Sequence, residues 1–264
     1  MEEIVNSFAE CLAPRLRAAL TQSVWAPTPR LLTLSVVGNI GVGKSTLLDE
    51  MEWYIEKMPA QRPEFRELFS NLEFVFIKEP VEAFKDIFRI FRTNKMAAGP
   101  WQIANLVHFE AHTIDVEHRA TALAPGKTLV VIFERSPLCI EHVFGPLQHA
   151  DITLSHGEVL RSMLVDVKRS VVWEDAIYLY LHCDASSLGG RVEERGREFE
   201  NSSDAYRDAI EDRYRTMIEE IPTKCVDANV HDLMVWEMRG LAMRLANCIA
   251  NQLLEERRGP PGRN

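Results

Sequence analysis

The sequence lacks the features that mark membrane, secreted and nucleic-acid-binding proteins. No stretch approaches the roughly 20 consecutive apolar residues that a helix needs to cross a bilayer. The five cysteines lie far apart and form no Cys-x-x-Cys pair, so neither a zinc site nor a disulfide framework is indicated. A formal charge of −9 at pH 7 argues against a broad basic surface for DNA or RNA. We therefore expect small-molecule partners, no nucleic acid and no membrane.

The composition and the two ends of the chain predict one domain with short extensions. A length of 264 residues, 46% of them hydrophobic, suffices for one sizeable core. A helical pattern followed by a proline-punctuated connector predicts an N-terminal helical extension and linker at residues 1–30. The charged, Gly- and Pro-rich residues 255–264 predict a disordered tail after a domain spanning residues 31–254. The acidic opening favours a cytoplasmic location over mitochondrial import.

Five short runs of apolar and β-branched residues predict β-strands. They lie at Leu31–Val37, Leu72–Ile77, Thr128–Phe133, Ile177–Leu181 and Thr223–Val226. Longer segments with apolar residues at helical spacing separate them, and this alternation predicts a parallel sheet. Strands of such a sheet are buried on both faces and should be nearly continuously apolar, as residues 129–133 are. The predicted fold class is therefore α/β.

The strongest local motif is a phosphate-binding loop. Residues 38–45 satisfy Gly-x-x-x-x-Gly-Lys-Ser/Thr, after a predicted strand and before an amphipathic helix. In such a loop the backbone amides surround phosphate oxygens, Lys44 reaches the β- and γ-phosphates of a nucleotide, and Ser45 binds Mg²⁺. The candidate nucleotide-binding residues are Gly38, Asn39, Ile40, Gly41, Val42, Gly43, Lys44, Ser45 and Thr46.

A P-loop alone does not distinguish GTPases, transport ATPases and small-molecule kinases. A GTPase would need an Asn-Lys-x-Asp motif, whereas Asn94 and Lys95 are followed by Met96 and Ala97. The Leu-Ser-Gly-Gly-Gln segment of transport ATPases is also missing. Both of these classes are therefore disfavoured.

Charged residues directly follow the second and third predicted strands. Glu79 comes after the run that ends at Ile77, and Glu134 and Arg135 come after the run that ends at Phe133. Chemistry in open α/β sheets gathers at the carboxyl ends of the strands. Each carboxylate alone is as well explained by a surface charge or a helix-cap partner. Their combination with a P-loop favours a functional role.

Taken in order, five motifs resemble those of the deoxynucleoside kinases. They are the P-loop, Glu79-Pro80-Val81, Trp101-Gln102, Glu134-Arg135-Ser136 and Arg191-x-x-x-Arg195-x-Arg197. The resemblance spans roughly residues 31–254. It implies a three-layer P-loop kinase fold with a five-stranded parallel sheet in the order 2-3-1-4-5 and an arginine-rich lid. It also implies a homodimer that transfers the γ-phosphoryl group of ATP, with Mg²⁺, to the 5′-hydroxyl of a deoxynucleoside.

By position, the resemblance implies catalytic roles for Glu79, Arg135 and Lys44. Glu79 matches the general base that accepts the 5′-hydroxyl proton, and Arg135 matches the arginine beside the 5′-oxygen. Glu134 matches the carboxylate near Mg²⁺, which makes Ser45 and Glu134 the candidate metal ligands.

The same resemblance implies residues that bind the substrate and cover ATP. Gln102 matches the amide that reads the base, and Phe144 matches the ring that stacks on it, although a phenylalanine is more often simply core. Arg191, Arg195 and Arg197 match the lid, for which a solvated charged helix is the alternative. Glu200 matches the carboxylate that accepts the sugar 3′-hydroxyl.

Departures from the family pattern bear on the choice of substrate. Phe109 and Ile140 stand where deoxycytidine and deoxyguanosine kinases have an arginine and an aspartate. The apolar wall that results could pack against a thymine methyl group, so we expect a pyrimidine preference with thymidine favoured. Phe91 stands where a tyrosine normally shares the 3′-hydroxyl with Glu200, so 3′-deoxy analogues should be better tolerated.

Two rival functions remain open from the sequence. A nucleoside monophosphate kinase of the thymidylate type would need extra cationic groups, and a carboxylate such as Glu79 would repel a substrate phosphate. A catalytically silent nucleotide-binding protein is the second rival. The intact Lys44, Ser45, Glu79 and Arg135 argue against it.

Overall fold

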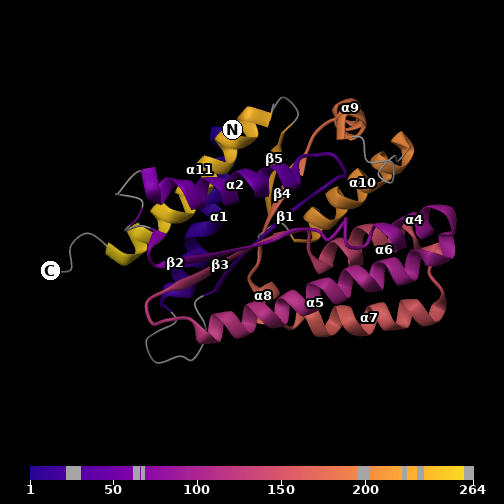
Figure 1. The fold of residues 1–264 in the computed structure, drawn as a ribbon, viewed down its shortest axis with the longest axis horizontal. Helices are drawn as coiled ribbons and strands as arrows, with labels where there is room; N and C mark the ends of the chain where they lie inside the picture. The colour runs from indigo at the N-terminus through magenta and orange to yellow at the C-terminus, as the bar shows by residue number, and fades with distance from the viewer. Residues whose placement is uncertain are drawn as a thin grey trace.

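The computed structural model describes residues 1–21, 31–61, 66, 69–195, 203–221, 225–230 and 235–258. Five strands form one sheet in the predicted order β2-β3-β1-β4-β5 (Figure 1). Their bounds are Leu31–Gly38 for β1, Leu72–Ile77 for β2, Thr128–Glu134 for β3, Ile177–His182 for β4 and Cys225–Asn229 for β5. Every neighbouring pair is parallel, so the predicted fold class and strand order are confirmed.

The last strand, β5, ends later than the sequence pattern indicates. It continues past Val226 to Asn229, although Asp227 interrupts the apolar run. β5 is an edge strand, so the Asp227 side chain remains largely exposed and pairs with His182 of β4 at 2.7 Å. The strand therefore accommodates the carboxylate without burying an unpaired charge. The predicted start at Thr223 lies outside the described residues.

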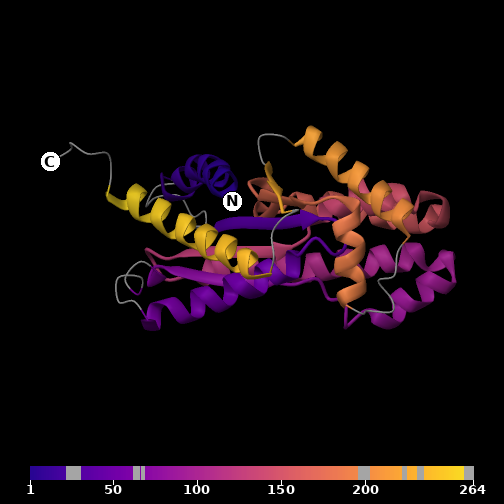
Figure 2. The same cartoon turned by 90° about the horizontal axis from the view of Figure 1, so that it is seen from above.

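One face of the sheet is covered by α1 (Glu2–Thr21), α2 (Lys44–Gln61) and α11 (Val235–Arg258). Figure 1 shows these helices grouped together, and Figure 2 shows α11 running alongside α2. Their apolar faces and the sheet form one core, to which the fully buried side chains of Phe8, Leu48 and Leu245 belong. Because α11 is helical through Arg258, the helix continues past residue 254. Residues 259–264 of the expected tail lie outside the described residues.

The other face is covered by α5 (Ala98–Ala122), α7 (Leu154–Lys168), α8 (Val171–Glu174) and α10 (Asp204–Glu220). Figure 1 shows α5 and α7 side by side. A second core cluster, which includes Phe133, Trp173 and Tyr214, joins these helices to the sheet. The structure thus has the predicted three layers. None of the helices in the described ranges is long and apolar enough to span a bilayer.

Short elements follow the carboxyl ends of three strands and surround the region where the site lies. After β2 come α4 (Lys85–Thr93) and the 3₁₀ turn η1 (Lys95–Ala97). After β3 come the π-helix η2 (Cys139–Phe144), α6 (Gly145–Leu147) and the 3₁₀ turn η3 (His149–Asp151). After β4 comes α9 (Ala185–Arg195).

The N-terminal helix α1 is part of the core. Ile4, Phe8 and Leu12 recur at four-residue spacing, so they share one helix face, and all three are buried. They belong to the same cluster as residues of β1, β5 and α11, and α1 contacts α11 and β5. The predicted extension therefore packs directly on the sheet beside α11, in the same layer as α2 and α11.

Replacing Phe8 with alanine should test whether α1 contributes to stability. Phe8 is 1% exposed. Its removal from a packed core should lower the free energy of unfolding by about 3 kcal/mol. The exposed Glu10 on the same helix is the matched control, and Glu10→Ala should change the free energy by less than about 0.5 kcal/mol. Urea unfolding measures both, and equal effects of the two substitutions would contradict the docking of α1.

Candidate active site

The P-loop joins β1 to α2 in a conformation that requires glycine. Gly38, Gly41 and Gly43 have φ values of 142°, 83° and 103°, which other residues rarely adopt. A Cβ atom on Gly38 would lie only 2.2 Å from the carbonyl oxygen of Leu181 in β4. The spacing of glycines in the motif is thus explained by backbone conformation and by the close approach of β4. Such a loop at a helix N-terminus is suited to bind phosphate.

Lys44 and Asn39 hold the interior of the loop. The buried Lys44 ammonium donates to the carbonyl oxygens of Gly38 at 3.1 Å and Asn39 at 2.7 Å. The Asn39 side chain accepts from the N–H of Ile40 at 2.8 Å and donates to the main-chain oxygen of Arg207 at 2.8 Å. Since Arg207 lies on α10, the P-loop is tied to that helix as well as to the sheet.

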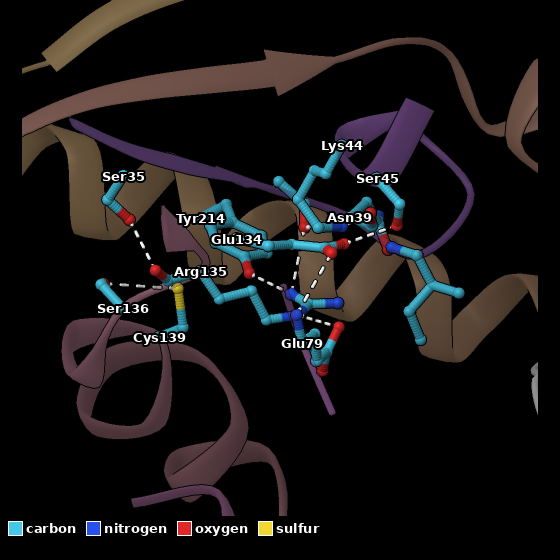
Figure 3. Close-up of polar contacts among 12 residues, drawn as sticks. Ser35, Asn39, Lys44, Ser45, Glu79, Glu134, Arg135, Ser136, Cys139 and Tyr214 are labelled. Carbon is cyan, nitrogen blue, oxygen red and sulfur yellow. Dashed lines mark hydrogen bonds and ion pairs between the residues drawn. The ribbon is translucent and has the colours of Figure 1, made fainter. Parts of the chain in front are cut away.

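Glu79 and Arg135 form the central ion pair of the site (Figure 3). Glu79 follows β2 and Arg135 follows β3, and the parallel pairing of these strands brings the two side chains together. Arg135 Nε donates to Glu79 Oε2 at 2.9 Å, and the side chains are only 8% and 19% exposed, respectively. Arg135 Nη1 donates to the carbonyl oxygen of Gly38 at 3.2 Å and to Tyr214 Oη at 2.6 Å. One guanidinium therefore links the end of β2, the P-loop and α10.

The main chain of Arg135 has a conformation that normally favours glycine. Its φ is 70°, and no other non-glycine residue within the described ranges has a positive φ. The Arg135 N–H donates to the carbonyl oxygen of Val36 at 2.8 Å, and its own carbonyl oxygen accepts from Ser35 Oγ at 2.7 Å. Strain of this kind concentrates at functional positions. Here β1 holds the strained residue in place.

The charges of the site are set by burial and by their neighbours. Burial lowers the pKa of Arg135, but the charge of Glu79 opposes this, and the resulting pKa is well above its ordinary value. Burial raises the pKa of Tyr214, so its phenol stays protonated beside Arg135. Burial, together with the charge of His112, lowers the pKa of His108 to about 4. His108 is therefore neutral at pH 7, whereas Arg135 is charged and contacts Glu79.

Ser45 and Glu134 lie together in a way that fits a metal bound with the nucleotide. Ser45 Oγ donates to Glu134 Oε1 at 2.7 Å, and Glu134 Oε2 accepts from the N–H of Glu79 at 3.3 Å. Hydroxyl and carboxylate oxygens suit Mg²⁺ when phosphate oxygens and waters complete its shell. The described residues contain no separate cluster of three or more His, Cys, Asp or Glu that could hold a metal.

A cavity of about 400 Å³ opens beside the ion pair. Its volume lies within the range of small-molecule sites. Lys44 of the P-loop lines it, together with residues of α4, α5, η2 and α10. Each described residue predicted to bind the substrate lines it as well: Glu79, Phe91, Gln102, Phe109, Arg135, Ile140 and Phe144.

One wall of the cavity is apolar, and buried side-chain amides supply polar groups elsewhere on its lining. Phe109 and Ile140 are both buried, and Phe109 packs edge-on against Trp173 at 6.0 Å between ring centroids. Gln102 is also buried, and its Nε2 donates to Gln148 Oε1 at 2.9 Å. The site therefore combines an apolar surface with a few fixed polar groups, as small-molecule sites usually do.

Phe144 has a second contact that the sequence did not reveal. The Arg135 Cζ atom lies 4.9 Å from the centroid of the Phe144 ring, which is a cation–π arrangement. The ring also meets Tyr214 edge-on at 6.5 Å. Phe144 is thus not simply core, because it lines the cavity and supports the guanidinium.

Arg191 contacts the P-loop and the end of β5. Its Nη1 donates to the carbonyl oxygen of Val42 at 3.3 Å, and its Nη2 donates to that of Val230 at 3.1 Å. Arg191 is therefore not simply a charged residue on a solvated helix surface. Two other predicted lid residues and the predicted 3′-hydroxyl acceptor are not described. The side chain of Arg195 and the whole of residues 197 and 200 lie outside the described residues.

Sequence reasoning missed several residues of the site, among them Gln148, Tyr206 and Tyr214. All three contact predicted residues or line the cavity. Tyr206 and Tyr214 lie on α10, where Ile210 and Tyr214 are buried at helical spacing. That spacing indicates a core-facing side of a helix, but it does not identify the element against which the helix packs. No sequence signal distinguished these residues from ordinary core.

The sheet, the P-loop and the short elements around the carboxyl ends of the strands are those of a P-loop kinase. A model of the deoxynucleoside kinase family matches residues 34–240. This match covers well over half of the chain, and the protein belongs to the deoxynucleoside kinase family.

The chain is also similar to solved structures. One of them is a deoxyadenosine kinase from M. mycoides with the products dCMP and a flexible dCDP bound. It is 19% identical, covers 82% of this chain and 99% of its own, and gives a TM-score of 0.51. At this identity the similarity shows the fold. No curated protein matches the chain.

Proposed function

We propose that this deoxynucleoside kinase transfers the γ-phosphoryl group of ATP to the 5′-hydroxyl of a pyrimidine deoxynucleoside, with thymidine preferred. The observation that carries the proposal is the Glu79–Arg135 pair, which faces a cavity beside the P-loop. A carboxylate, a fixed cation and a phosphate-binding loop at one cavity are the groups that phosphoryl transfer to a neutral hydroxyl requires.

In the proposed reaction, Glu79 acts as the general base. Its carboxylate accepts the proton of the 5′-hydroxyl while the 5′-oxygen forms a bond to the γ-phosphorus, and the bond from that phosphorus to the bridging oxygen of ADP breaks. Arg135 stabilises the negative charge on the reacting oxygens, because its guanidinium is held by Glu79, Gly38 and Tyr214 and needs little reorganisation.

The donor is ATP, held by residues 38–46. Lys44 exchanges its contacts with the loop carbonyl oxygens for contacts with the β- and γ-phosphates. Ser45 and Glu134 hold Mg²⁺, which neutralises phosphate charge when it is bound. Arg191, Arg195 and Arg197 form the lid over the phosphates, as their guanidinium groups suit phosphate oxygens.

The acceptor lies in the cavity with its base between Gln102 and the apolar wall. Gln102 reads the base, Phe144 stacks on it, and Phe109 and Ile140 accommodate the methyl group of thymine. Glu200 accepts a hydrogen bond from the 3′-hydroxyl. Since Phe91 also lines the cavity and carries no hydroxyl group, the 3′-position has one hydrogen-bond partner fewer than the family pattern.

An ATP-consumption assay with five acceptors tests the proposal. Purified protein, ATP and Mg²⁺ are combined with thymidine, deoxycytidine, deoxyadenosine, deoxyguanosine or thymidine monophosphate. We expect the highest kcat/KM with thymidine, because the apolar wall buries its methyl group, and a single buried methyl is worth on the order of tenfold.

The other outcomes of this assay are equally informative. A higher kcat/KM with deoxyguanosine would contradict the thymidine preference. Turnover with thymidine monophosphate alone would make the protein a monophosphate kinase, and no turnover with any acceptor would favour the catalytically silent alternative.

We also propose that a second copy of the chain packs on α5 and α7 to form a homodimer. These neighbouring helices expose large apolar side chains that a monomer would leave in water: Val107, Ile114, Val159 and Val165, each 45% to 48% exposed. Light scattering on the purified protein should give twice the mass of the chain, and Ile114→Glu should reduce it. A monomeric mass for the wild type would contradict the dimer.

A further inference from the structure

A chain of polar side chains runs along the wall of the acceptor cavity, from Gln102 on α5 through Gln148 to Tyr206 on α10. Gln102 Nε2 donates to Gln148 Oε1 at 2.9 Å, and Gln148 Nε2 donates to Tyr206 Oη at 3.5 Å. All three residues line the cavity, and the two glutamines are 1% and 3% exposed. Gln148 therefore connects the base-reading amide to a second helix.

The main chain of Gln148 is fixed on both sides. Its N–H donates to the carbonyl oxygen of Phe144 at 3.1 Å, and its carbonyl oxygen accepts from the N–H of Asp151 at 2.9 Å. A buried amide that loses its partner is costly, so the side chain should keep its contact with Gln102. The Gln102–Gln148 hydrogen bond is thus a fixed part of the cavity wall and differs from a chance contact between surface side chains.

This chain of hydrogen bonds can run in either direction. The oxygen and nitrogen of an amide are nearly equal in size, so rotating both amides by half a turn places Gln148 Nε2 against Gln102 Oε1. The Tyr206 hydroxyl then donates to Gln148 Oε1, because a phenol both donates and accepts. Burial raises the pKa of Tyr206, which keeps this proton in place. Each direction preserves both hydrogen bonds.

We propose that Gln148 is a specificity-determining residue, which allows the Gln102 amide to face the base in either of two orientations. The inference rests on the proposed function, in which Gln102 reads the base. In the part of the chain that the structure describes, no hydrogen bond occupies Gln102 Oε1, so this oxygen and the second N–H are available to a ligand. Gln148 acts on the base through Gln102.

The two orientations suit two classes of base. Thymine presents an N3–H donor beside a carbonyl acceptor, whereas cytosine presents an N3 acceptor beside an amino donor. These patterns are the reverse of each other, so a reversible amide pairs with both and a fixed amide pairs with one. The substrate class is therefore pyrimidine deoxynucleosides with either the thymine or the cytosine hydrogen-bonding pattern. The preference for thymidine comes from the apolar wall of Phe109 and Ile140.

Replacing Gln148 with glutamate tests this directly. A carboxylate only accepts hydrogen bonds, so Gln148→Glu should hold Gln102 in the orientation where Nε2 faces residue 148. The ratio of kcat/KM for thymidine to that for deoxycytidine should then change by about tenfold or more, since one edge loses its paired contacts. Gln148→Met, which is similar in length and forms no such bond, should lower both values and change the ratio by less than about threefold.

The pH dependence separates orientation from packing. A buried carboxyl group has a raised pKa and gains a proton as the pH falls, and the protonated form can donate. Between about pH 8 and about pH 6, the ratio in Gln148→Glu should therefore return toward the wild-type ratio. The ratios of the wild type and Gln148→Met should stay constant.

The result that overturns this inference is the same ratio in Gln148→Glu as in Gln148→Met, with an active wild type. That result would leave Gln148 as a packing residue and the proposed function intact. If the wild type turned over neither nucleoside, the proposed function would fail, and this inference would fail with it.

Discussion

The buried ion pair between Arg135 and Glu79 is the interaction around which the rest of the site is arranged. Parallel pairing of β2 with β3 brings the two residues together, and the guanidinium then contacts the P-loop through Gly38 and α10 through Tyr214. The sheet, the phosphate loop and the helix after the lid segment meet at one side chain. A displacement of any of them would therefore shift the Glu79 carboxylate, which faces the acceptor cavity.

An arrangement of this kind is unfavourable for folding unless its neighbours support it. Burial of two charges carries a desolvation cost, and the positive φ of Arg135 adds strain. Hydrogen bonds from Ser35 and to Val36 hold the strained main chain, while Phe144 and Tyr214 surround the guanidinium. A cation pre-oriented in this way needs no rearrangement when negative charge develops, which is what electrostatic catalysis requires. The buried pair and the strained main chain of Arg135 thus lower the stability of the fold at the proposed catalytic position.

The sequence predicted the parts of this arrangement that follow from local pattern. Runs of mostly apolar and β-branched residues located β1 to β4, although β1 carries the buried Thr33 and Ser35 and the edge strand β2 is only half-buried. The P-loop follows from its glycines. The ends of β2 and β3 identified Glu79 and Arg135. The apolar pattern alone ended β5 at Val226, because Asp227 breaks the run, which an edge strand tolerates. Tyr214 and Gln148 could not be predicted, since their partners lie far away in the sequence and depend on how α10 and α6 pack.

The most direct test of the account is the effect of Glu79→Gln on turnover and on ATP binding, with Glu82→Gln as the matched exposed control. Glutamine keeps the shape of the side chain and an oxygen for Arg135, but it cannot accept the 5′-hydroxyl proton. The account predicts that kcat for thymidine falls by about 10²- to 10⁴-fold. The affinity for ATP, measured by titration calorimetry, should stay within about threefold of the wild type, because the P-loop is unchanged. A kcat close to that of the wild type and of Glu82→Gln would contradict the account.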